Sequence, residues 1–522
     1  MNMERRDLLK ALGTVAVPSA LGTCAASTAA PVPPSSGNKP NILVFLSDDH
    51  GQWLQQAYGN SEVRTPNMDR IARNGVRMRN AFTTSPVCSP ARASFFTGRM
   101  PSQHGIHDWI EESKQAYAYP WLKDQTLISQ LLKTAGYHTG LVGKWHCGEE
   151  RYPHPGFDFW FSYWVSQYPH AGRQNFSDNG RHVSEDGIQS PFLTRQAIHF
   201  LRTHYGSKTT KDMPFFLFVG YTDTHLPHTE MPVDLVSQYS TATFRDIPSE
   251  PFPACHGKAV NPVSTDPAVE RTKREQYYAA ASSIDREVGK VLDELESMGQ
   301  LSNTLVVYTG DHGLNAGHHG MWEKGNATIP QNFFEESIRV PCAISWPAGG
   351  IPCNLESDLP VNHCDLFATL LDAANAAPDA ETAKKIASPG RSYLSQLRGS
   401  SPSHWKNRAI CEYGNARMIR IDGYKLILRY PYKGVNFANE LYDLKADPRE
   451  ANNLYNSSRT QYRQVIEQMT SQLDEFFSKY TVPGHSGLNL EHQPVATAAS
   501  PWLKAIALRK HQQAGVPVPS LR

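Results

Sequence analysis

Three residues of the stretch CSPAR have the types and the spacing to build a nucleophile. Cys88 precedes Pro90 and Arg92, so the pattern predicts a thiol at the start of a helix with a permanent cation one turn away. A cysteine placed in this way is either one half of a disulfide or the starting material of a nucleophile. Other parts of the sequence have to distinguish the two.

Acidic residues follow two apolar segments that have the character of buried strands. Asp48 and Asp49 come directly after NILVFLS, and Asp311 and His312 come directly after LVVYTG. Open parallel sheets bind ligands beyond the carboxyl ends of their strands. Three carboxylates and an imidazole at one such edge would be unfavourable without a cation between them. Either group alone could be a polar turn, but both together predict a site for a divalent cation.

These side chains need a sheet to position them, and the sequence predicts one. Short apolar runs alternate with amphipathic segments, which indicates parallel strands covered by helices on both faces. We expect an α/β fold with a large mostly parallel sheet sandwiched by helices. The expected strands are 41–47, 137–143, 214–221, 303–313 and 340–347, and the expected helices are 65–75 (with Thr65 as N-cap), 126–136 and 271–299.

The pattern changes near residues 390–399. Four short strands joined by polar turns follow, and then a helix over 460–480, which predicts a smaller C-terminal α+β domain with a short antiparallel sheet. The predicted organisation is an export signal and linker at 1–38, a catalytic domain at 39–395, a C-terminal subdomain at 396–482 and an irregular tail at 483–522.

Composition excludes some classes of partner. The 522 residues include 51 Lys plus Arg and 50 Asp plus Glu, a net charge of +1 that predicts no attraction to nucleic acid. The 22 Tyr and 10 Trp would suit stacking on sugar rings if they were exposed, although such residues are more often buried in a core.

The N-terminus has the character of an export signal. Residues 4–10 (ERRDLLK) carry paired arginines before a weakly apolar run that Pro18 interrupts, a pattern similar to twin-arginine signals. A general secretion signal with a fortuitous arginine pair is the alternative, and Cys24 makes a poor lipoprotein site. We expect an exported protein, periplasmic or extracellular, whose mature chain has no integral membrane segment.

Eight cysteines raise the question of disulfides. Without Cys24 and Cys88, six remain that could pair in an oxidising compartment. Cys342 and Cys353 flank a turn rich in proline and glycine, and they are the favoured pair.

Ordered motifs resemble those of type I sulfatases of the cysteine class, in the alkaline phosphatase-like superfamily. CSPAR followed by TGR matches their Cys-x-Pro-x-Arg signature, with Phe95 and Phe96 as conservative departures. GYHTGLVGKWH (136–146) matches the second signature throughout. SDDHG, THLPH, GDHG and WEKGN occur in the family's order, so the resemblance covers about residues 40–450.

The resemblance implies what Cys88 becomes. In the family a formylglycine-generating enzyme oxidises this cysteine to formylglycine, and the aldehyde hydrate attacks sulfur and is transiently sulfated. A thiolate would leave a stable adduct, whereas a geminal diol keeps a second hydroxyl to expel sulfate. Arg92 would hold the diol. A disulfide at Cys88 is then disfavoured, and a cysteine phosphatase loop needs a longer spacing between Cys and Arg.

The resemblance also implies one divalent cation. Its ligands would be Asp48, Asp49, Asp311 and His312 together with the oxygen derived from Cys88. The family usually binds calcium, often with Asn or Asp in the fourth place. His312 is instead a feature of the choline-sulfatase and phosphonate monoester hydrolase branches, and a nitrogen ligand leaves manganese open.

Four further residues take catalytic roles by matched position. Lys144 and Lys324 would bind sulfate oxygens, although either alone could be a solvated lysine. His146 would orient the diol and take its proton, and His225 would protonate the leaving alcohol, with a turn residue as the alternative.

Other residues near these motifs could touch the rest of the substrate. No HExxH spacing supports a three-histidine zinc site among them. They are His107, Trp109, His228, His318, His319, Trp322 and Asn326.

The sequence thus predicts an exported sulfatase that cleaves the S–O bond of a sulfate ester in a sulfated carbohydrate. A phosphonate monoester or phosphodiester hydrolase, a choline-sulfatase-like enzyme of small molecules, and a binding protein in which Cys88 stays unconverted are the alternatives.

Overall fold

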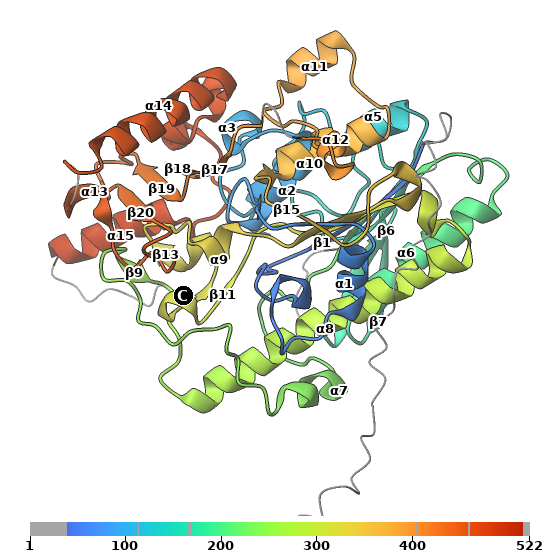
Figure 1. The fold of residues 1–522 in the computed structure, drawn as a ribbon, viewed down its shortest axis with the longest axis horizontal. Helices are drawn as coiled ribbons and strands as arrows, with labels where there is room; N and C mark the ends of the chain where they lie inside the picture. The colour runs from blue at the N-terminus through green and yellow to red at the C-terminus, as the bar shows by residue number, and fades with distance from the viewer. Residues whose placement is uncertain (1–38, 113, 165–169, 402–404, 458–459, 515–522) are drawn as a thin grey trace, which may run out of the picture.

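A ten-stranded mixed sheet crosses the molecule in the computed structural model, which describes residues 39–514 apart from 113, 165–169, 402–404 and 458–459 (Figure 1). The predicted export signal, linker and Cys24 lie outside the described residues. The strands lie in the order β15 (Leu355–Ser357), β2 (Val76–Met78), β14 (Cys342–Ser345), β10 (Thr304–Gly310), β1 (Asn41–Ser47), β8 (Phe215–Gly220), β4 (His138–Gly143), β5 (Phe159–Tyr163), β6 (Arg173–Asp178) and β7 (Arg181–Asp186).

The centre of this sheet is parallel, as predicted, and its flanks are partly antiparallel. Strands β10, β1, β8, β4 and β5 run in one direction. Strand β14 pairs antiparallel with β10, and β6 and β7 continue antiparallel beyond β5. No long crossover helix connects β10 to β14 within the described residues, so the chain returns in the opposite direction.

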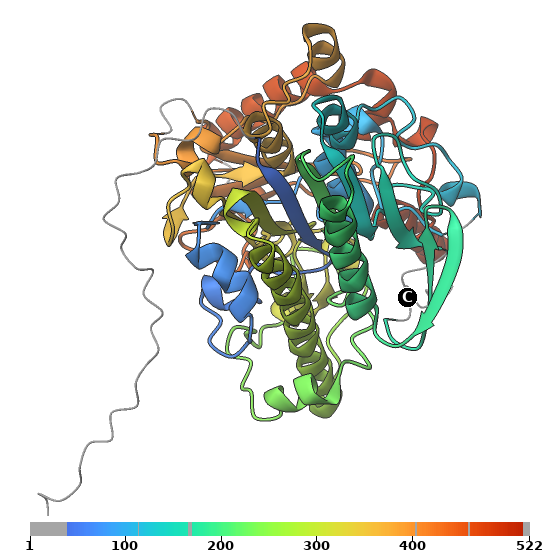
Figure 2. The ribbon, with the colours of Figure 1, turned by 90° about the vertical axis from the view of Figure 1, so that its right-hand side faces the viewer.

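Alternate residues of β1 face two different cores. Ile42 and Val44 pack with helices α2 (Cys88–Thr97), α5 (Ile128–Thr134) and α10 (His363–Ala373). Leu43 and Phe45 pack with α1 (Pro66–Arg73), α6 (Gln189–Gly206) and α8 (Pro267–Ser297) on the opposite face. Figure 2 shows α6 and α8 side by side across that face.

Helix α1 begins at Pro66 as predicted, but the cap differs from the expectation. The hydroxyl of Thr65 makes no capping bond to the helix. Instead Thr65 accepts a hydrogen bond from the backbone of Gln56 at 3.0 Å, which ties the preceding loop to the helix start.

A smaller antiparallel sheet forms the predicted C-terminal unit, in the order β17 (Arg408–Tyr413), β18 (Ala416–Ile421), β19 (Tyr424–Arg429) and β20 (Glu440–Asp443). One face packs on α14 (Arg463–Tyr480). The other packs on the main domain, where Val87 precedes helix α2. The small sheet therefore supports the segment that carries Cys88.

The segment after residue 482 is more regular than expected. Helix α15 (Pro501–Ala514) follows two short turns, and Trp502 lies against Tyr413 with ring centroids 5.7 Å apart. A side chain at Gly414, whose φ is 53°, would collide with the Trp502 ring, so the glycine allows this contact. The apolar pattern of α15 is too weak to have predicted the helix from the sequence.

Shorter elements connect the larger ones: β3 (Ala81–Phe82), α3 (Pro101–His104), α4 (Lys114–Tyr117), α7 (Val233–Val236), β9 (Lys258–Ala259), β11 (Asn315–Ala316), β12 (Trp322–Glu323), β13 (Thr328–Ile329), α9 (Glu335–Ile338), β16 (Val361–Asn362), α11 (Ala380–Ile386), α12 (Leu394–Leu397) and α13 (Leu454–Ser457). Among the helices of the described chain, none combines the length and the apolar character that crossing a bilayer requires.

The favoured disulfide is wrong. Cys342 and Cys353 are both free thiols, as are the other cysteines of the described residues. Cys342 begins β14 and Cys353 precedes β15, and strand β2 lies between these two strands. Strands two positions apart are separated by roughly 10 Å, beyond the reach of a disulfide.

Candidate active site

Four adjacent parallel strands deliver most of the predicted site residues to one edge of the sheet, while Cys88 and Arg92 lie on α2 and Lys324 follows β12. Ser47 of β1 pairs with Gly310 of β10, so Asp48 and Asp311 leave the sheet side by side. Strands β8 and β4 end in register at the same edge, and their following loops carry His225 and Lys144 respectively. The strand order thus brings together residues that lie far apart in the sequence.

The five predicted metal ligands come together in two overlapping groups. Asp48, Cys88, Asp311 and His312 form one group, and Asp48, Asp49, Cys88 and His225 form the other; within each, the ligand atoms lie within 4.8 Å of one another. The Nε2 atom of His312 lies 3.2 Å from Cys88 Sγ, 3.4 Å from Asp49 Oδ1 and 3.5 Å from Asp311 Oδ1. His225 was predicted as a catalytic residue of this site, and not as one of the metal ligands.

The chemistry of this cluster fits a divalent cation. Asp49 Oδ2 is buried and accepts no hydrogen bond among the described residues. Burial raises the pKa of Asp49, and the neighbouring carboxylates of Asp48 and Asp311 add to this effect against the opposing charge of Lys324. A cation bound among the carboxylate oxygens would compensate for their lost hydration and would reduce the repulsion between them.

His312 is oriented to offer a lone pair to the same point. Its Nδ1 donates a hydrogen bond to the carbonyl of Gly313 at 2.9 Å, which fixes the proton on that nitrogen. Nε2 then faces the carboxylates unprotonated, the arrangement that metal-binding histidines use. Burial lowers the pKa of His312, and the charge of Lys324 lowers it further, so the ring stays neutral near pH 7.

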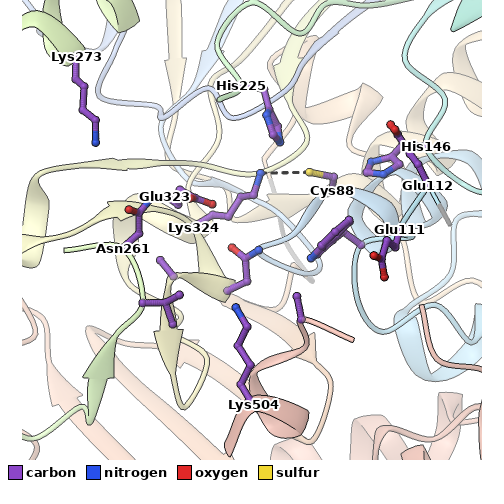
Figure 3. A pocket seen from close by; sticks show the side chains of 15 residues that line it. Cys88, Glu111, Glu112, His146, His225, Asn261, Lys273, Glu323, Lys324 and Lys504 are labelled. Atoms are coloured by element: carbon purple, nitrogen blue, oxygen red, sulfur yellow. Dashed lines mark hydrogen bonds between the residues drawn. The ribbon is translucent and has the colours of Figure 1, made fainter. Parts of the chain in front are cut away.

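Cys88 begins helix α2, and its side chain is almost entirely buried at 2% exposure. The thiol donates to Asp48 Oδ1 at 3.4 Å and accepts from Lys324 Nζ at 3.4 Å (dashed line in Figure 3). Burial raises the pKa of this thiol, and the Asp48 carboxylate raises it further. The unmodified side chain is therefore a protonated thiol and a poor nucleophile.

Arg92 lies beneath the cluster, one turn along α2 from Cys88. Its Nε donates to Asp311 Oδ2 at 2.8 Å, and its Nη1 donates to the Lys144 carbonyl at 2.8 Å. Nη2 is buried without a hydrogen-bond partner in the described chain, 4.0 Å from Asp48 Oδ1. The guanidinium of Arg92 therefore partly neutralises the carboxylates of Asp311 and Asp48.

The two predicted sulfate-binding lysines occupy different positions. Lys324 Nζ lies 2.5 Å from Asp49 Oδ1, and its side chain lines the pocket. Lys144 is fully buried, donates to Asp48 Oδ2 and does not line the pocket. Burial opposes the charge of Lys324, but Asp49 and the other anions raise its pKa well above the ordinary value, so it is a cation.

His146 and His225 both line the pocket beside Cys88 (Figure 3). His225 Nδ1 donates to the Leu226 carbonyl at 2.9 Å, so the neutral ring presents an unprotonated Nε2. His146 Nε2 donates to the Ile110 carbonyl at 3.1 Å, which leaves Nδ1 unprotonated. Burial lowers the pKa of both rings.

Three residues of this region hold a left-handed backbone. Asp49 has φ 55°, His146 has φ 54° and Glu323 has φ 81°. For residues other than glycine such conformations cost on the order of 1 kcal/mol each and concentrate at functional sites. At Glu323 the backbone turn directly precedes Lys324, the lysine that reaches Cys88.

A pocket of about 720 Å³ opens above Cys88. Of the residues predicted to touch the remainder of the substrate, Trp109 and Asn326 line it. The others have structural contacts: His107 bonds the His485 carbonyl, His228 packs on Tyr277 and Trp322, His318 packs on Trp53, His319 bonds Glu336, and Trp322 bonds Glu270.

Several charged residues of the pocket were not predicted. Glu111 and Glu112 lie on the side of His146, Lys273 lies on the side of Asn261, and Lys504 approaches from below Lys324 (Figure 3). Glu111 and Glu112 directly follow the segment that contains Trp109, and this adjacency is the signal by which the sequence places them near the site. Nothing in the sequence relates Lys273 or Lys504 to the motifs, because both lie on helices remote from them.

This fold, with a buried cysteine and a cluster of acids at the strand ends, defines a hydrolase of the alkaline phosphatase-like superfamily. Residues 40–376 match the sulfatase family model, and residues 317–479 match the model for the C-terminal region of N-sulphoglucosamine sulphohydrolase. The chain belongs to the sulfatase family, whose members are sulfuric ester hydrolases.

Similar proteins span most of the chain. An N-acetylglucosamine-6-O-sulfatase of Bacteroides thetaiotaomicron is 26% identical over 510 residues, covering 85% of this chain and 87% of its own length. The N-acetylgalactosamine-6-sulfatase of Canis lupus familiaris is 30% identical, covering 66% of this chain and 63% of its own. A structure solved in complex with its substrate D-glucosamine-2-N,6-O-disulfate superposes with a TM-score of 0.70 at 23% identity, covering 85% of this chain and 98% of that one.

Proposed function

We propose that this protein hydrolyses sulfate esters of carbohydrates by S–O cleavage, with a formylglycine derived from Cys88 as nucleophile. The observation that carries the proposal is the position of Cys88 Sγ, 3.4 Å from Lys324 Nζ at the floor of an open pocket. The names of the relatives, an N-acetylglucosamine-6-O-sulfatase and an N-acetylgalactosamine-6-sulfatase, support a sulfated amino sugar as substrate.

Asp48, Asp49, Asp311 and His312 would hold the cation, together with the oxygen at position 88. A bound divalent cation supplies Lewis acidity and a fixed position for the reacting oxygens. Calcium is the expected ion, and the nitrogen of His312 leaves manganese as the other candidate. A formylglycine-generating enzyme would convert Cys88 during maturation and so place a hydroxyl oxygen where the sulfur lies.

The two lysines would neutralise negative charge, and the two histidines would transfer protons. Lys324 would neutralise a sulfate oxygen as the S–O bond breaks, and Lys144 would keep Asp48 ionised from behind. His225 presents Nε2 to the pocket and would protonate the leaving alcohol after taking up a proton at that atom. His146 presents the unprotonated Nδ1, which would accept the proton of the second hydroxyl at position 88.

We also propose that the protein is exported. The paired arginines and the following apolar run within residues 1–38 support this, and fractionation of cells that express the full chain tests it.

The first experiment is the mass of the peptide that contains Cys88, together with sulfate release. Formylglycine makes that peptide about 18 Da lighter than the cysteine form. We expect the converted protein to release sulfate from 6-sulfated amino sugars faster than from choline sulfate. A preference for phenyl phosphonate over nitrophenyl sulfate would instead establish the phosphonate hydrolase that His312 suggests.

A further inference from the structure

His146 occupies an unfavourable backbone conformation beside Cys88, and its ring is held at one point. Its φ is 54°, in the left-handed region that residues other than glycine seldom adopt. The ring donates from Nε2 to the Ile110 carbonyl at 3.1 Å, and Nδ1 is buried without a hydrogen-bond partner among the described residues. His146 lines the pocket together with Cys88 (Figure 3). A contact to the backbone must stabilise this conformation.

The side chain of Glu150 makes that contact. Its Oε1 accepts a hydrogen bond from the backbone N–H of His146 at 2.8 Å, and its Oε2 lies 3.4 Å from the backbone nitrogen of Trp145. Glu150 is itself fixed, because its carbonyl accepts from Trp160 Nε1 at 2.8 Å and its N–H donates to the Tyr117 hydroxyl at 3.0 Å. The carboxyl group therefore closes the loop that follows β4 and sets the backbone at His146.

The contacts of Glu150 favour the uncharged form of its carboxyl group. Ser162 Oγ lies 2.8 Å from Glu150 Oε2 and 2.8 Å from the Gly143 carbonyl. A hydroxyl group has one proton and cannot direct it at both oxygens. When Glu150 carries a proton on Oε2, it donates to Ser162, Ser162 donates to Gly143, and both contacts are hydrogen bonds. Burial also raises the pKa of Glu150 to about 7.

The titratable groups around Glu150 do not reverse this preference. The charge of Lys144 lowers the pKa of Glu150 and that of Glu112 raises it, and burial has a larger effect than either. Burial also shifts the pKa values of the other neighbouring groups in the direction that leaves them uncharged near pH 7. These groups are His146, Cys147, Tyr117 and Tyr163.

We propose that Glu150 is a positioning residue, whose uncharged carboxyl group holds the backbone of His146 so that Nδ1 of that ring stays beside position 88. The inference rests on the proposed function, in which Nδ1 accepts the proton of the second hydroxyl at position 88. Sulfate leaves when that hydroxyl loses its proton, its oxygen forms the carbonyl bond and the C–O bond to sulfate breaks. Glu150 therefore acts on the release of sulfate and not on the earlier release of the alcohol.

The test replaces Glu150 by glutamine and by leucine. E150Q keeps an oxygen that accepts from His146 and an N–H group that donates to Ser162, whereas E150L has neither. Sulfate release per converted protein should fall about tenfold or more in E150L, through kcat with little change in KM, and should stay within about twofold of the native rate in E150Q. Normal kcat in E150L, or an equal loss in both variants, would overturn the proposal.

The step that becomes slow distinguishes positioning from general damage to the pocket. With nitrophenyl sulfate, E150L should release a first equivalent of nitrophenol rapidly and then turn over slowly, and the peptide that contains position 88 should carry a sulfate. A slow first turnover without a burst would overturn the proposal.

Two further variants complete the series. E149Q is the matched control, because Glu149 is the adjacent residue and pairs with Arg151 instead, so both kinetic constants should stay normal. E150D keeps the acid but shortens its reach to His146, and it takes the place of E150L if that variant does not fold. Normal kcat in E150D would then overturn the proposal.

The structure of the Cys88→Ser protein, which cannot be converted, separates this inference from the proposed function. In crystals of this protein, E150L should release the left-handed backbone of His146 and its hydrogen bond to Ile110, and E150Q should keep both. An unmoved His146 in E150L would refute the positioning role whatever the converted enzyme does. The expected displacement together with a converted native enzyme that releases no sulfate would refute the proposed function alone.

The melting temperature tests the uncharged carboxyl group in the same Cys88→Ser protein. Because burial raises the pKa of Glu150 from 4.5 to about 7, the folded state binds the proton more tightly than the unfolded state does. Stability from this group is present below pH 4.5 and is lost as the pH rises to about 7, whereas glutamine has no such loss. The melting temperature of E150Q should therefore rise relative to that of the Glu150 protein over this range. A constant difference would refute the uncharged form.

Discussion

Gly310 pairs with Ser47 at the ends of two parallel strands, and this register places the carboxylates of Asp311 and Asp48 next to each other in a fully buried site. Burial raises the pKa of Asp311 to about 7, and the negative charge of Asp48 adds to the effect. For Asp48 burial acts in the same direction, but Lys144 and the other surrounding cations hold its pKa well below the ordinary value. One edge of the sheet thus concentrates negative charge that a cation would stabilise.

Removal of divalent cations is expected to lower both activity and stability. A ligand that binds only the folded protein raises the free energy of unfolding, by about 2.7 kcal/mol at a hundredfold excess over its dissociation constant. Dialysis against a chelator should therefore lower the melting temperature, and calcium or manganese should restore it. An unchanged melting temperature and full activity after exhaustive chelation would contradict the site at Asp48, Asp49, Asp311 and His312.

Replacement of Cys88 by alanine is expected to abolish sulfate release while the fold persists. The side chain would supply the nucleophilic oxygen after the proposed conversion, and among the described residues that line the pocket no other carries a hydroxyl or a thiol. Circular dichroism should match that of the unchanged protein. Cys255→Ala, at an exposed cysteine, is the control and should keep normal turnover. Normal activity of Cys88→Ala would refute the assigned role.

Lys324→Ala is expected to reduce kcat about a hundredfold or more, because a preorganised cation at the site of developing charge is lost. It also leaves Asp49 without its 2.5 Å ion pair, so the free energy of unfolding should fall as well. Lys290→Ala is the comparison, since that half-exposed lysine pairs with Glu287 on α8. Equal kcat values for the two variants would exclude a catalytic role for Lys324.

Much of the fold could be predicted because local signals agreed with the tertiary structure. The apolar runs before Asp48 and Asp311 form neighbouring strands, and Pro66 begins a helix as the sequence suggests. Motifs that directly follow strands were therefore assigned to the correct edge of the sheet. The small antiparallel sheet could also be predicted, because apolar and polar residues alternate along its strands and the turns between them are short.

Features that depend on distant parts of the chain could not be predicted. The direction of β14 depends on the path of the long connection between β10 and β14. The separation of Cys342 from Cys353 depends on β2, a strand formed by residues 76–78 that pairs with β14. Lys504 reaches the pocket only because Trp502 anchors α15 on Gly414. The pairing of β2 with β14 and the packing of Trp502 on Gly414 leave no periodic signal in the sequence.

The pair His319–Glu336 predicts a pH dependence of stability away from the metal cluster. His319 Nε2 donates to Glu336 Oε2 at 2.8 Å. Although burial acts against both charges, the pairing raises the pKa of His319 above 6.5 and lowers that of Glu336 from 4.5 to about 2. The contribution of Glu336 to the free energy of unfolding is present above pH 4.5 and is lost as the pH falls toward 2. The histidine's contribution is present below pH 6.5 and is lost as pH rises through its folded pKa.

The stabilisation is therefore largest between about pH 4.5 and 6.5. His319→Gln should lower the free energy of unfolding by about 2 kcal/mol in that window, and the difference should shrink toward pH 9. Denaturant unfolding at several pH values measures it. His182→Gln, at an exposed histidine of β7, should show no such window. A difference that stays constant with pH would refute the charged pair.

The burial of helix α2 restricts when its first residue can be altered. All ten residues of Cys88–Thr97 are buried in the folded protein, and of these only Cys88 lines the pocket. Any enzyme that must grasp this segment to oxidise the thiol therefore meets it only before the main sheet and the small sheet enclose it. If Cys88 is converted as proposed, conversion and folding would compete, and a chain that folds first would keep the inert thiol.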